Sequence, residues 1–138
     1  MSSSKFVVMK HSAKKAGEHF DLRFQIPNSN MWASFACRKQ IPLSMGVKIL
    51  AIRTNDHSEK EALLTGEIES GYGAGILIKW DSGSCEIEKY SESHIAINFK
   101  GSKLKGLYHM INTGVMDDNG KNDSRGGKSY LLFKGKVE

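Results

Sequence analysis

The fold of this chain is indicated most clearly by the stretch His19-Phe20-Asp21-Leu22-Arg23-Phe24-Gln25-Ile26. Every second residue is apolar, and the residues between them are polar. Successive side chains of a β-strand point to opposite faces, so this period of two predicts a strand. One face of the strand would be anchored in a core, and the other would present a histidine, a carboxylate and an arginine side by side.

The polar face of this strand has two interpretations. An imidazole and a carboxylate together suit a borderline divalent ion such as Mn²⁺ or Zn²⁺, and His11 could supply a third ligand across the connection that contains Gly17. Arg23 would then meet a phosphate or a carboxylate through its planar guanidinium. The alternative is an ordinary solvated strand face, which is the usual meaning of such alternation.

Short strands separated by glycine, asparagine and serine dominate the rest of the chain. The predicted strands are 5–10, 19–26, 31–36, 48–53, 63–69, 75–80, 84–90, 94–100, 106–112 and 130–134. Turn residues lie between most of them, as at 27–30, 81–83 and 101–102. Short helical turns are expected at 12–16 and 58–62. This texture predicts an all-β fold, either an antiparallel barrel or a sandwich.

Length and charge narrow the class of protein. The 138 residues predict one domain, 1–138, that is large enough to bury a core. The formal net charge of +5 favours a polyanionic partner, but charge alone leaves DNA, RNA and simple solubility open. No apolar run approaches the roughly 18 residues of a membrane span, and the segment 6–9 is too short for a signal peptide. We therefore expect a cytoplasmic protein without a membrane partner.

Four further features receive an interpretation from the sequence. Cys37 and Cys85 belong to no C-x-x-C motif and are expected to be reduced, partly buried thiols. The apolar-free segment 117–128 is expected to be a flexible loop rather than a calcium site. The glycine-rich segment 71–75 could cradle a phosphate, but a tight turn or bulge at a barrel corner is the favoured interpretation. His57 follows an apolar strand directly and is expected in a loop, where it could be a surface histidine or a site residue.

Several short motifs occur in a fixed order along nearly the whole chain. They are Phe6-Val7-Val8, His11-x-Ala13, His19-Phe20-Asp21-Leu22-Arg23, Asp56-His57, Gly71-Tyr72-Gly73-Ala74-Gly75, Trp80-Asp81-x-Gly83, Phe99-x-Gly101-x-Lys103-Leu104-x-Gly106 and Tyr130-Leu131-Leu132-x-Lys134. In this order they resemble the 3′-phosphoesterase domain found at the front of bacterial DNA ligase D and as standalone archaeal proteins.

This resemblance implies a compact antiparallel β-barrel that binds Mn²⁺, with Zn²⁺ or Co²⁺ as alternatives. It implies a DNA-repair hydrolase that removes a 3′-terminal ribonucleoside and then the 3′-phosphate, leaving a 3′-hydroxyl. His11, His19 and Asp21 would bind the metal, and Arg23 and His57 would engage the scissile phosphate. The expected partners are nucleic acid 3′ ends and a separate DNA ligase or polymerase, with the chain itself a monomer.

Lysines near this site are expected to contact phosphates electrostatically, and they are Lys10, Lys14, Lys15 and Lys39. The sequence departs from the bacterial pattern in having seven residues between His11 and His19 instead of five, and Glu61 where a tyrosine is usual. A non-catalytic module of the same fold that only binds nucleic acid ends is therefore the alternative function.

Overall fold

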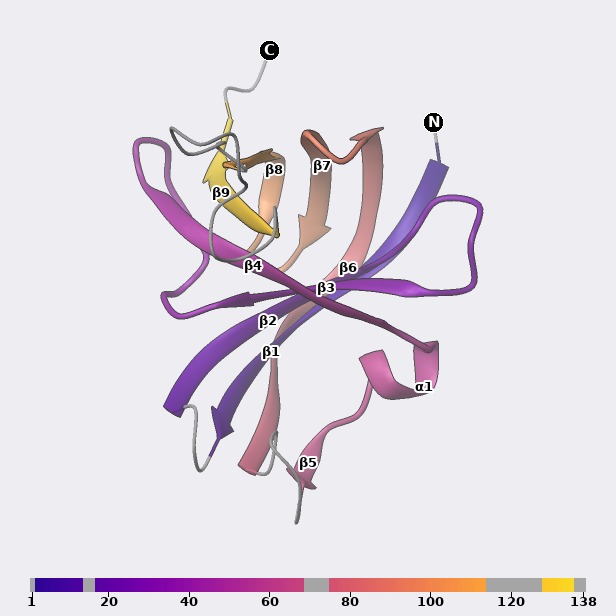
Figure 1. Ribbon diagram of the computed structural model, residues 1–138, viewed down its shortest axis with the longest axis vertical. Helices are drawn as coiled ribbons and strands as arrows, with labels where there is room; N and C mark the ends of the chain where they lie inside the picture. Colours follow the sequence, from indigo (N-terminus) through magenta and orange to yellow (C-terminus); the bar gives the residue numbers. More distant parts are fainter. Residues whose placement is uncertain (1, 14–16, 69–74, 114–127, 136–138) are drawn as a thin grey trace, which may run out of the picture.

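Nine strands and one short helix make up the computed structural model, which describes residues 2–13, 17–68, 75–113 and 128–135 (Figure 1). The elements in chain order are β1 (Ser2–Ala13), β2 (Gly17–Gln25), β3 (Trp32–Cys37), β4 (Lys48–His57), α1 (Glu59–Ala62), β5 (Gly66–Ile68), β6 (Gly75–Tyr90), β7 (His94–Gly101), β8 (Lys105–Asn112) and β9 (Ser129–Lys134). In the described part of the chain, no helix has the length and apolar character that a membrane span needs.

Eight of the strands close into an antiparallel barrel. Their order is β1-β2-β3-β4-β9-β8-β7-β6, and β6 pairs back onto β1 along almost its whole length. The short strand β5 adds to β6 outside this circle. Closure pairs the backbone groups that an open sheet would leave at its edges. The predicted all-β antiparallel barrel is confirmed.

The barrel interior is filled by alternate residues of each strand. Phe6 and Val8 of β1 and Phe20, Leu22 and Phe24 of β2 point into it and are buried. Rings meet edge to face inside, as between Phe6 and Phe99, whose centroids lie 4.7 Å apart. The apolar set of residues that predicted the strand 19–26 is therefore the one that faces the core.

A second, smaller apolar cluster lies outside the barrel, on the opposite face of β1 and β2. Its members are Val7, Met9, Trp32, Ala62 and Leu77. Because α1 and Trp32 cover this outer face, the polar residues Asp21 and Arg23 are buried as well, at 6% and 7% exposure. The alternation of β2 is as predicted, but neither face of its central part is solvated.

The helix α1 begins with a capping box. The Ser58 hydroxyl accepts a hydrogen bond from the Glu61 backbone N–H, and the Glu61 carboxylate accepts one from the Ser58 backbone N–H. Such reciprocal bonds satisfy amide groups that a helix start leaves unpaired. The helical turn predicted at 58–62 is confirmed, whereas Ser12 of the turn predicted at 12–16 lies in β1, and 14–16 are outside the described residues.

The structure corrects the sequence analysis along β6. The predicted turn at 81–83 does not exist, and the two strands predicted around it are one strand, Gly75–Tyr90. A bulge shifts the register, because Val8 pairs with Asp81 and Met9 with Lys79. Gly83 serves a close approach between strands, since a Cβ there would lie 2.5 Å from the Lys100 carbonyl oxygen.

Other predictions have mixed outcomes. The turn at 27–30 is present, and both cysteines are free and buried. Burial raises the pKa of each thiol to about 12, so both are poor nucleophiles. Residues 71–74 of the glycine-rich segment and 117–127 of the predicted loop lie outside the described residues.

A buried carboxylate fixes the connection between β7 and β8. Asp81 accepts hydrogen bonds from the backbone N–H groups of Ser102, Lys103 and Leu104 at 2.9, 3.0 and 2.8 Å. Burial raises the pKa of Asp81, but these bonds outweigh burial and bring it below the usual value of 3.8. Gly101 makes the approach possible, because a Cβ there would lie 2.5 Å from the carboxylate.

We predict that Asp81→Ala lowers the free energy of unfolding by about 2–3 kcal/mol, because one buried and two partly buried N–H groups lose their acceptor. The pKa of Asp81 is lower in the folded than in the unfolded protein, where it is about 3.9. The difference in unfolding free energy between wild type and variant is therefore largest above that pH, and it shrinks as the pH falls through the folded-state pKa. Urea unfolding of both proteins at a series of pH values between 7 and 2 measures this difference. The control Glu86→Ala, which breaks an exposed ion pair to Lys100, is expected to cost under about 1 kcal/mol. Equal losses in the two variants would contradict the assigned role.

Candidate metal centre

Two neighbouring strands bring two imidazoles and one carboxylate together on the outer face of the barrel. His11 of β1 pairs directly with His19 of β2, and the two rings lie 4.6 Å apart between centroids. Asp21 follows two residues after His19 on the same face of β2. The hydrogen-bonding register of β1 and β2, rather than proximity in sequence, therefore assembles this trio.

The Asp21 carboxylate lies between the two histidines. One oxygen, Oδ1, lies 3.0 Å from His19 Nε2, and the other, Oδ2, lies 3.4 Å from His11 Nδ1. All three candidate ligand atoms lie within 4.8 Å of one another. His11 and Asp21 are buried, and His19 is half-buried, so the trio is reached from solvent on the His19 side.

The electrostatics of the trio favour a charged carboxylate. Burial raises the pKa of Asp21, but the hydrogen bond from His19 and the charges of His19, Arg23 and His11 outweigh it and hold the pKa below its usual range. The same hydrogen bond raises the pKa of His19. The site thus combines an ionised carboxylate with imidazole nitrogens, which are hard and borderline donors.

These donors fit a divalent ion. Two ligands on opposite sides of one ion at roughly 2.1 Å each would lie about 4.2 Å apart, so a small adjustment converts this cluster into a coordination shell. Three protein ligands leave a position open for water or substrate. The chemistry of the donor set, two nitrogens and a carboxylate oxygen, suits Mn²⁺, Zn²⁺ or Co²⁺ without selecting one.

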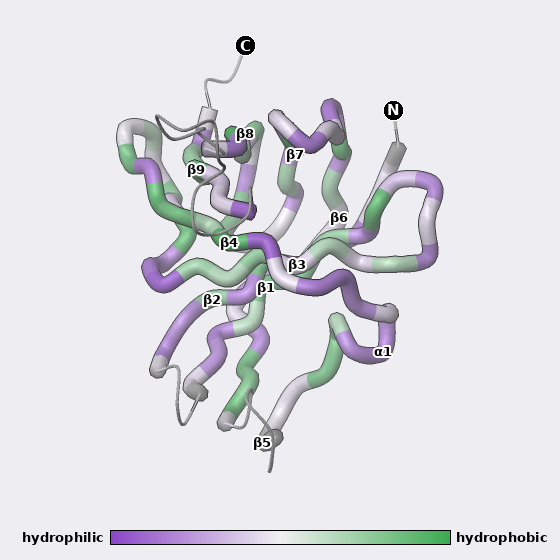
Figure 2. The backbone as a smooth tube through the Cα atoms, in the orientation of Figure 1, coloured by the Kyte–Doolittle hydropathy of each residue, from purple (hydrophilic) through white to green (hydrophobic). Residues whose placement is uncertain are grey.

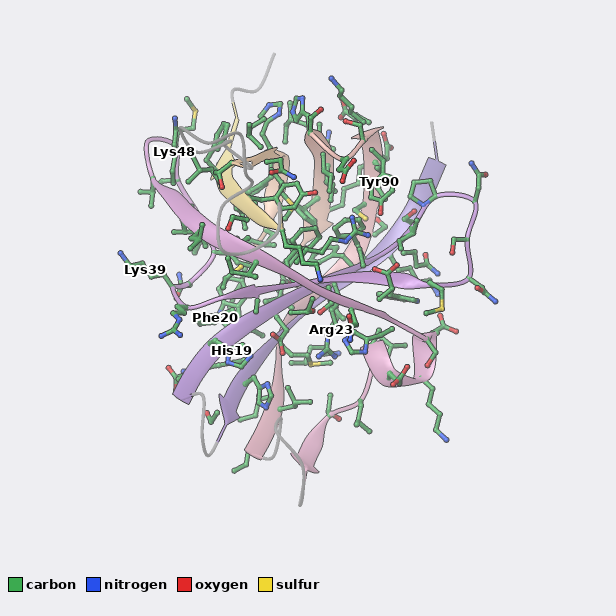
Figure 3. All side chains as sticks on the ribbon, in the orientation of Figure 1. His19, Phe20, Arg23, Lys39, Lys48 and Tyr90 are labelled. Carbon is green, nitrogen blue, oxygen red and sulfur yellow. The ribbon has the colours of Figure 1, made fainter. Side chains whose placement is uncertain are left out.

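Arg23 links the trio to α1. Its Nη2 lies 3.4 Å from Asp21 Oδ2, and its Nη1 donates to the backbone carbonyls of Ala62 and Glu61 at 3.0 and 3.3 Å. Figure 3 shows Arg23 between the strands and the helix. The Nε–H is buried and has no acceptor among the described residues, and burial lowers the pKa of the guanidinium. The arginine therefore contacts the Asp21 carboxylate and links it to α1, while its contact with a substrate phosphate stays a prediction.

His57 lies at the junction between β4 and α1. Sequence reasoning placed it in a loop, whereas it is the last residue of β4 and pairs with Trp32 of β3. It is half-buried, and burial followed by the nearby charge of Arg23 lowers its pKa. An imidazole that is neutral near pH 7 and sits beside Arg23 can accept a proton.

The predicted phosphate-contacting lysines have different outcomes. Lys10 directly precedes His11 on β1, so its side chain points to the opposite face of the strand; it pairs with Glu18 at 3.5 Å, with 42% of its side chain exposed. Lys39 is exposed beyond the end of β3 and points outward in Figure 3. Lys14 and Lys15 lie outside the described residues.

Sequence reasoning missed how α1 positions the site. Arg23 bonds to backbone carbonyls, which every residue type has, so no sequence pattern could indicate this contact. The Ser58-x-x-Glu61 spacing, however, matches a capping box and marks the start of the helix. Trp32, which covers the outer face, also went unassigned. Two other histidines, His94 and His109, bond to each other at 2.9 Å on β7 and β8 and form no group of three metal-binding side chains with other described residues.

Comparisons with known proteins agree with this geometry. The family described as "DNA Ligase D 3′-phosphoesterase domain" matches residues 9–112, which include the trio, Arg23 and His57. The chain is 35% identical over 113 residues to the multifunctional non-homologous end joining DNA repair protein LigD of Mycobacterium tuberculosis, covering 78% of this chain and 14% of that protein. The LigD proteins of Mycolicibacterium smegmatis and Pseudomonas aeruginosa are 34% and 32% identical over 124 and 117 residues, covering 81% and 80% of this chain.

This chain spans only 16% and 14% of the length of the latter two relatives. The similarity therefore concerns one domain of larger proteins. Within that domain, the match covers most of the barrel and all five residues of the site described above. The chain belongs to the DNA ligase D 3′-phosphoesterase domain family.

Proposed function

We propose that this chain is a metal-dependent 3′-phosphoesterase that heals DNA ends. It removes a 3′-terminal ribonucleoside and then the remaining 3′-phosphate, and it leaves the 3′-hydroxyl that ligation or synthesis requires. The observation that carries the proposal is the trio His11, His19 and Asp21, whose donor atoms lie within 4.8 Å of one another in a chain of this family.

His11, His19 and Asp21 would hold the ion, with Mn²⁺ as the proposed physiological metal. The chemistry that a divalent ion would supply there is polarisation of a phosphoryl oxygen and a lower pKa of a coordinated water. To serve as a ligand, His19 would exchange its contact with Asp21 for the ion, and its ligating nitrogen would have to be deprotonated.

Arg23 and His57 would act on the phosphate itself. Arg23 would stabilise negative charge on the phosphoryl oxygens through its guanidinium, whose Nε–H has no acceptor among the described residues. His57, whose pKa is lowered, exchanges a proton with the attacking or leaving oxygen near neutral pH. Lys10 and Lys39, with Lys14 and Lys15, would attract the nucleic acid backbone.

The relatives are named as end-joining proteins, and one as a DNA repair protein, so we place this chain in the same process. It would act as a monomer on ends that a separate DNA ligase or polymerase uses next. We further propose a cytoplasmic location, where the free thiols Cys37 and Cys85 remain reduced.

Turnover of a 3′-phosphate substrate tests the role of the trio. Asp21→Ala is expected to reduce phosphate release from a primer–template duplex with a 3′-phosphate by at least about a hundredfold, since even residues behind metal ligands contribute 10–100-fold. A second duplex that ends in one ribonucleotide tests the diesterase step. The control Glu88→Ala removes an exposed carboxylate of β6, eleven residues along the strand from Leu77, which pairs with His11, and should retain wild-type rates.

Wild-type rates in Asp21→Ala would overturn the assignment of the trio. Absence of turnover in the wild-type protein on both duplexes, with any of Mn²⁺, Zn²⁺ and Co²⁺, would favour the non-catalytic end-binding module instead, provided that the duplexes still bind.

Thermal stability with and without Mn²⁺ tests metal binding. A ligand that binds only the folded state stabilises it by about 2.7 kcal/mol at a hundred times its Kd, so Mn²⁺ should raise the Tm by several degrees. His19→Ala should abolish the shift, because it removes one of three ligands. His57→Ala should retain it, because His57 is not a proposed ligand. No shift in the wild-type protein at millimolar Mn²⁺ would contradict a metal centre.

The N-cap of α1 allows a test of how the helix positions Arg23. Ser58→Ala removes the N-cap and is expected to lower the free energy of unfolding by about 1 kcal/mol. Because the carbonyls that accept hydrogen bonds from Arg23 belong to this helix, kcat should fall as well, even when it is measured far below the melting temperature. Ser58→Asp, which can still cap, should restore both quantities.

The matched control is Ser91→Ala, which removes comparable local hydrogen bonds between β6 and β7. It should cost stability without changing kcat. A fall in kcat of the same size in Ser91→Ala would show that the loss at Ser58 reflects stability and not the position of Arg23.

A further inference from the structure

A groove of about 960 Å³ opens on the outer face of the barrel, between strands β1 and β6 on one side and the segment from α1 to β5 on the other. Figure 1 shows α1 below the end of β4 and β5 beside the lower end of β6. This volume lies at the upper end of the range in which proteins hold small ligands. The proposed metal ligands do not line the groove.

The groove and the trio nevertheless share one surface. Lys5, Val7 and Met9 line the groove, and His11 is the next residue of β1 that points to the same face. In the register with β2, Val7 lies opposite Arg23 and Met9 lies opposite Asp21. A molecule that leaves the trio along β1 therefore enters the groove directly.

The floor of the groove is apolar. Val7, Met9, Trp32 and Leu77 form it and are each at most 3% exposed. The rim is apolar too, because Leu63 and Ile78 are 46% and 60% exposed. Figure 2 shows these rim segments in green, after α1 and at the start of β6. Large exposed apolar side chains beside a groove are typical of a surface that contacts a ligand.

Two ammonium groups accompany this apolar surface. Lys79 of β6 lies opposite Met9 in the register, and Lys5 lies further along β1. Both side chains are exposed, and neither forms an ion pair with a carboxylate among the described residues. The groove contains one acidic side chain, Glu59, so its lining carries more positive than negative charge.

We infer that this groove binds the nucleotides that precede the 3′-terminal phosphate of the substrate strand, with sugars and bases on the apolar floor and phosphates at Lys79 and Lys5. A nucleic acid strand is the ligand that combines apolar rings with a regular series of negative charges. The inference rests on the proposed function, because the terminal phosphate must lie at the trio.

The spacing along β1 agrees with such a strand. Met9, opposite Lys79, is two residues from His11, or about 7 Å at roughly 3.3 Å per residue. Lys5 is six residues from His11, or about 20 Å. Phosphates of one DNA strand follow each other at about 3.4 Å along the helix axis, so this path accommodates several of them.

The test compares Lys5→Ala/Lys79→Ala with the control Lys89→Ala/Lys105→Ala, which removes two exposed lysines outside the groove. Binding of a fluorescent single-stranded oligonucleotide with a 3′-phosphate is measured by anisotropy, without metal, from 50 to 200 mM salt. Because each phosphate contact contributes about 0.7 to the slope of log K against log salt, the groove variant should lose about 1.4. The control variant should keep the wild-type slope.

Turnover gives a second readout. The groove variant should raise the KM for the oligonucleotide on the order of tenfold with kcat unchanged, as expected for the loss of two phosphate contacts. Its KM for a deoxynucleoside 3′-monophosphate should equal that of wild type, since this substrate has no preceding phosphate.

Equal slopes in the groove and control variants would overturn the inference. An equal rise in KM for both substrates would also overturn it, because the lysines would then act on the terminal phosphate. If no protein turns over either substrate, the proposed function fails, and the binding slopes still decide whether the groove holds the strand.

Discussion

The buried Asp21 carboxylate is the constraint on which the outer face of the barrel depends. A charge that is 6% exposed is costly unless cationic or hydrogen-bonding groups surround it. His11 approaches one of its oxygens from the neighbouring strand β1, and His19 and Arg23 contact it from its own strand, β2. The two imidazoles that stabilise this carboxylate have their nitrogens 3.0 and 3.4 Å from its oxygens. The same three side chains are arranged so that they can bind a divalent ion.

The second constraint is the path of the chain from β4 to β5. This connection crosses the outer face, and α1 lies where its last carbonyls accept hydrogen bonds from Arg23. His57 directly precedes the helix cap, so the same link sets the distance between His57 and the trio. The capping box between Ser58 and Glu61 stabilises a helix of four residues that would otherwise be too short to persist. Glu61, which departs from the bacterial pattern, has a structural role of its own here.

Period-two alternation, a local signal, predicted the strand of Asp21 and an all-β fold, but it left a barrel and a sandwich open. The barrel, and the grouping of His11 with His19 and Asp21 as metal ligands, followed from the order of the family motifs. The sequence did not predict that both faces of β2 are buried, since the cover comes from Trp32 and α1, which are distant in sequence. It also divided β6 at 81–83, where turn-forming residues instead serve close packing and the buried carboxylate of Asp81. Tertiary contacts overrode local propensity at both places.

The two faces of β1 and β2 separate stability from chemistry. The inner face contributes Phe6, Leu22 and Phe24 to a core that closes without any polar member of the site. The outer face holds the trio, and the groove of about 960 Å³ continues from it along β1. Because successive side chains alternate between these faces, the groove lysines Lys5 and Lys79 take no part in the barrel core.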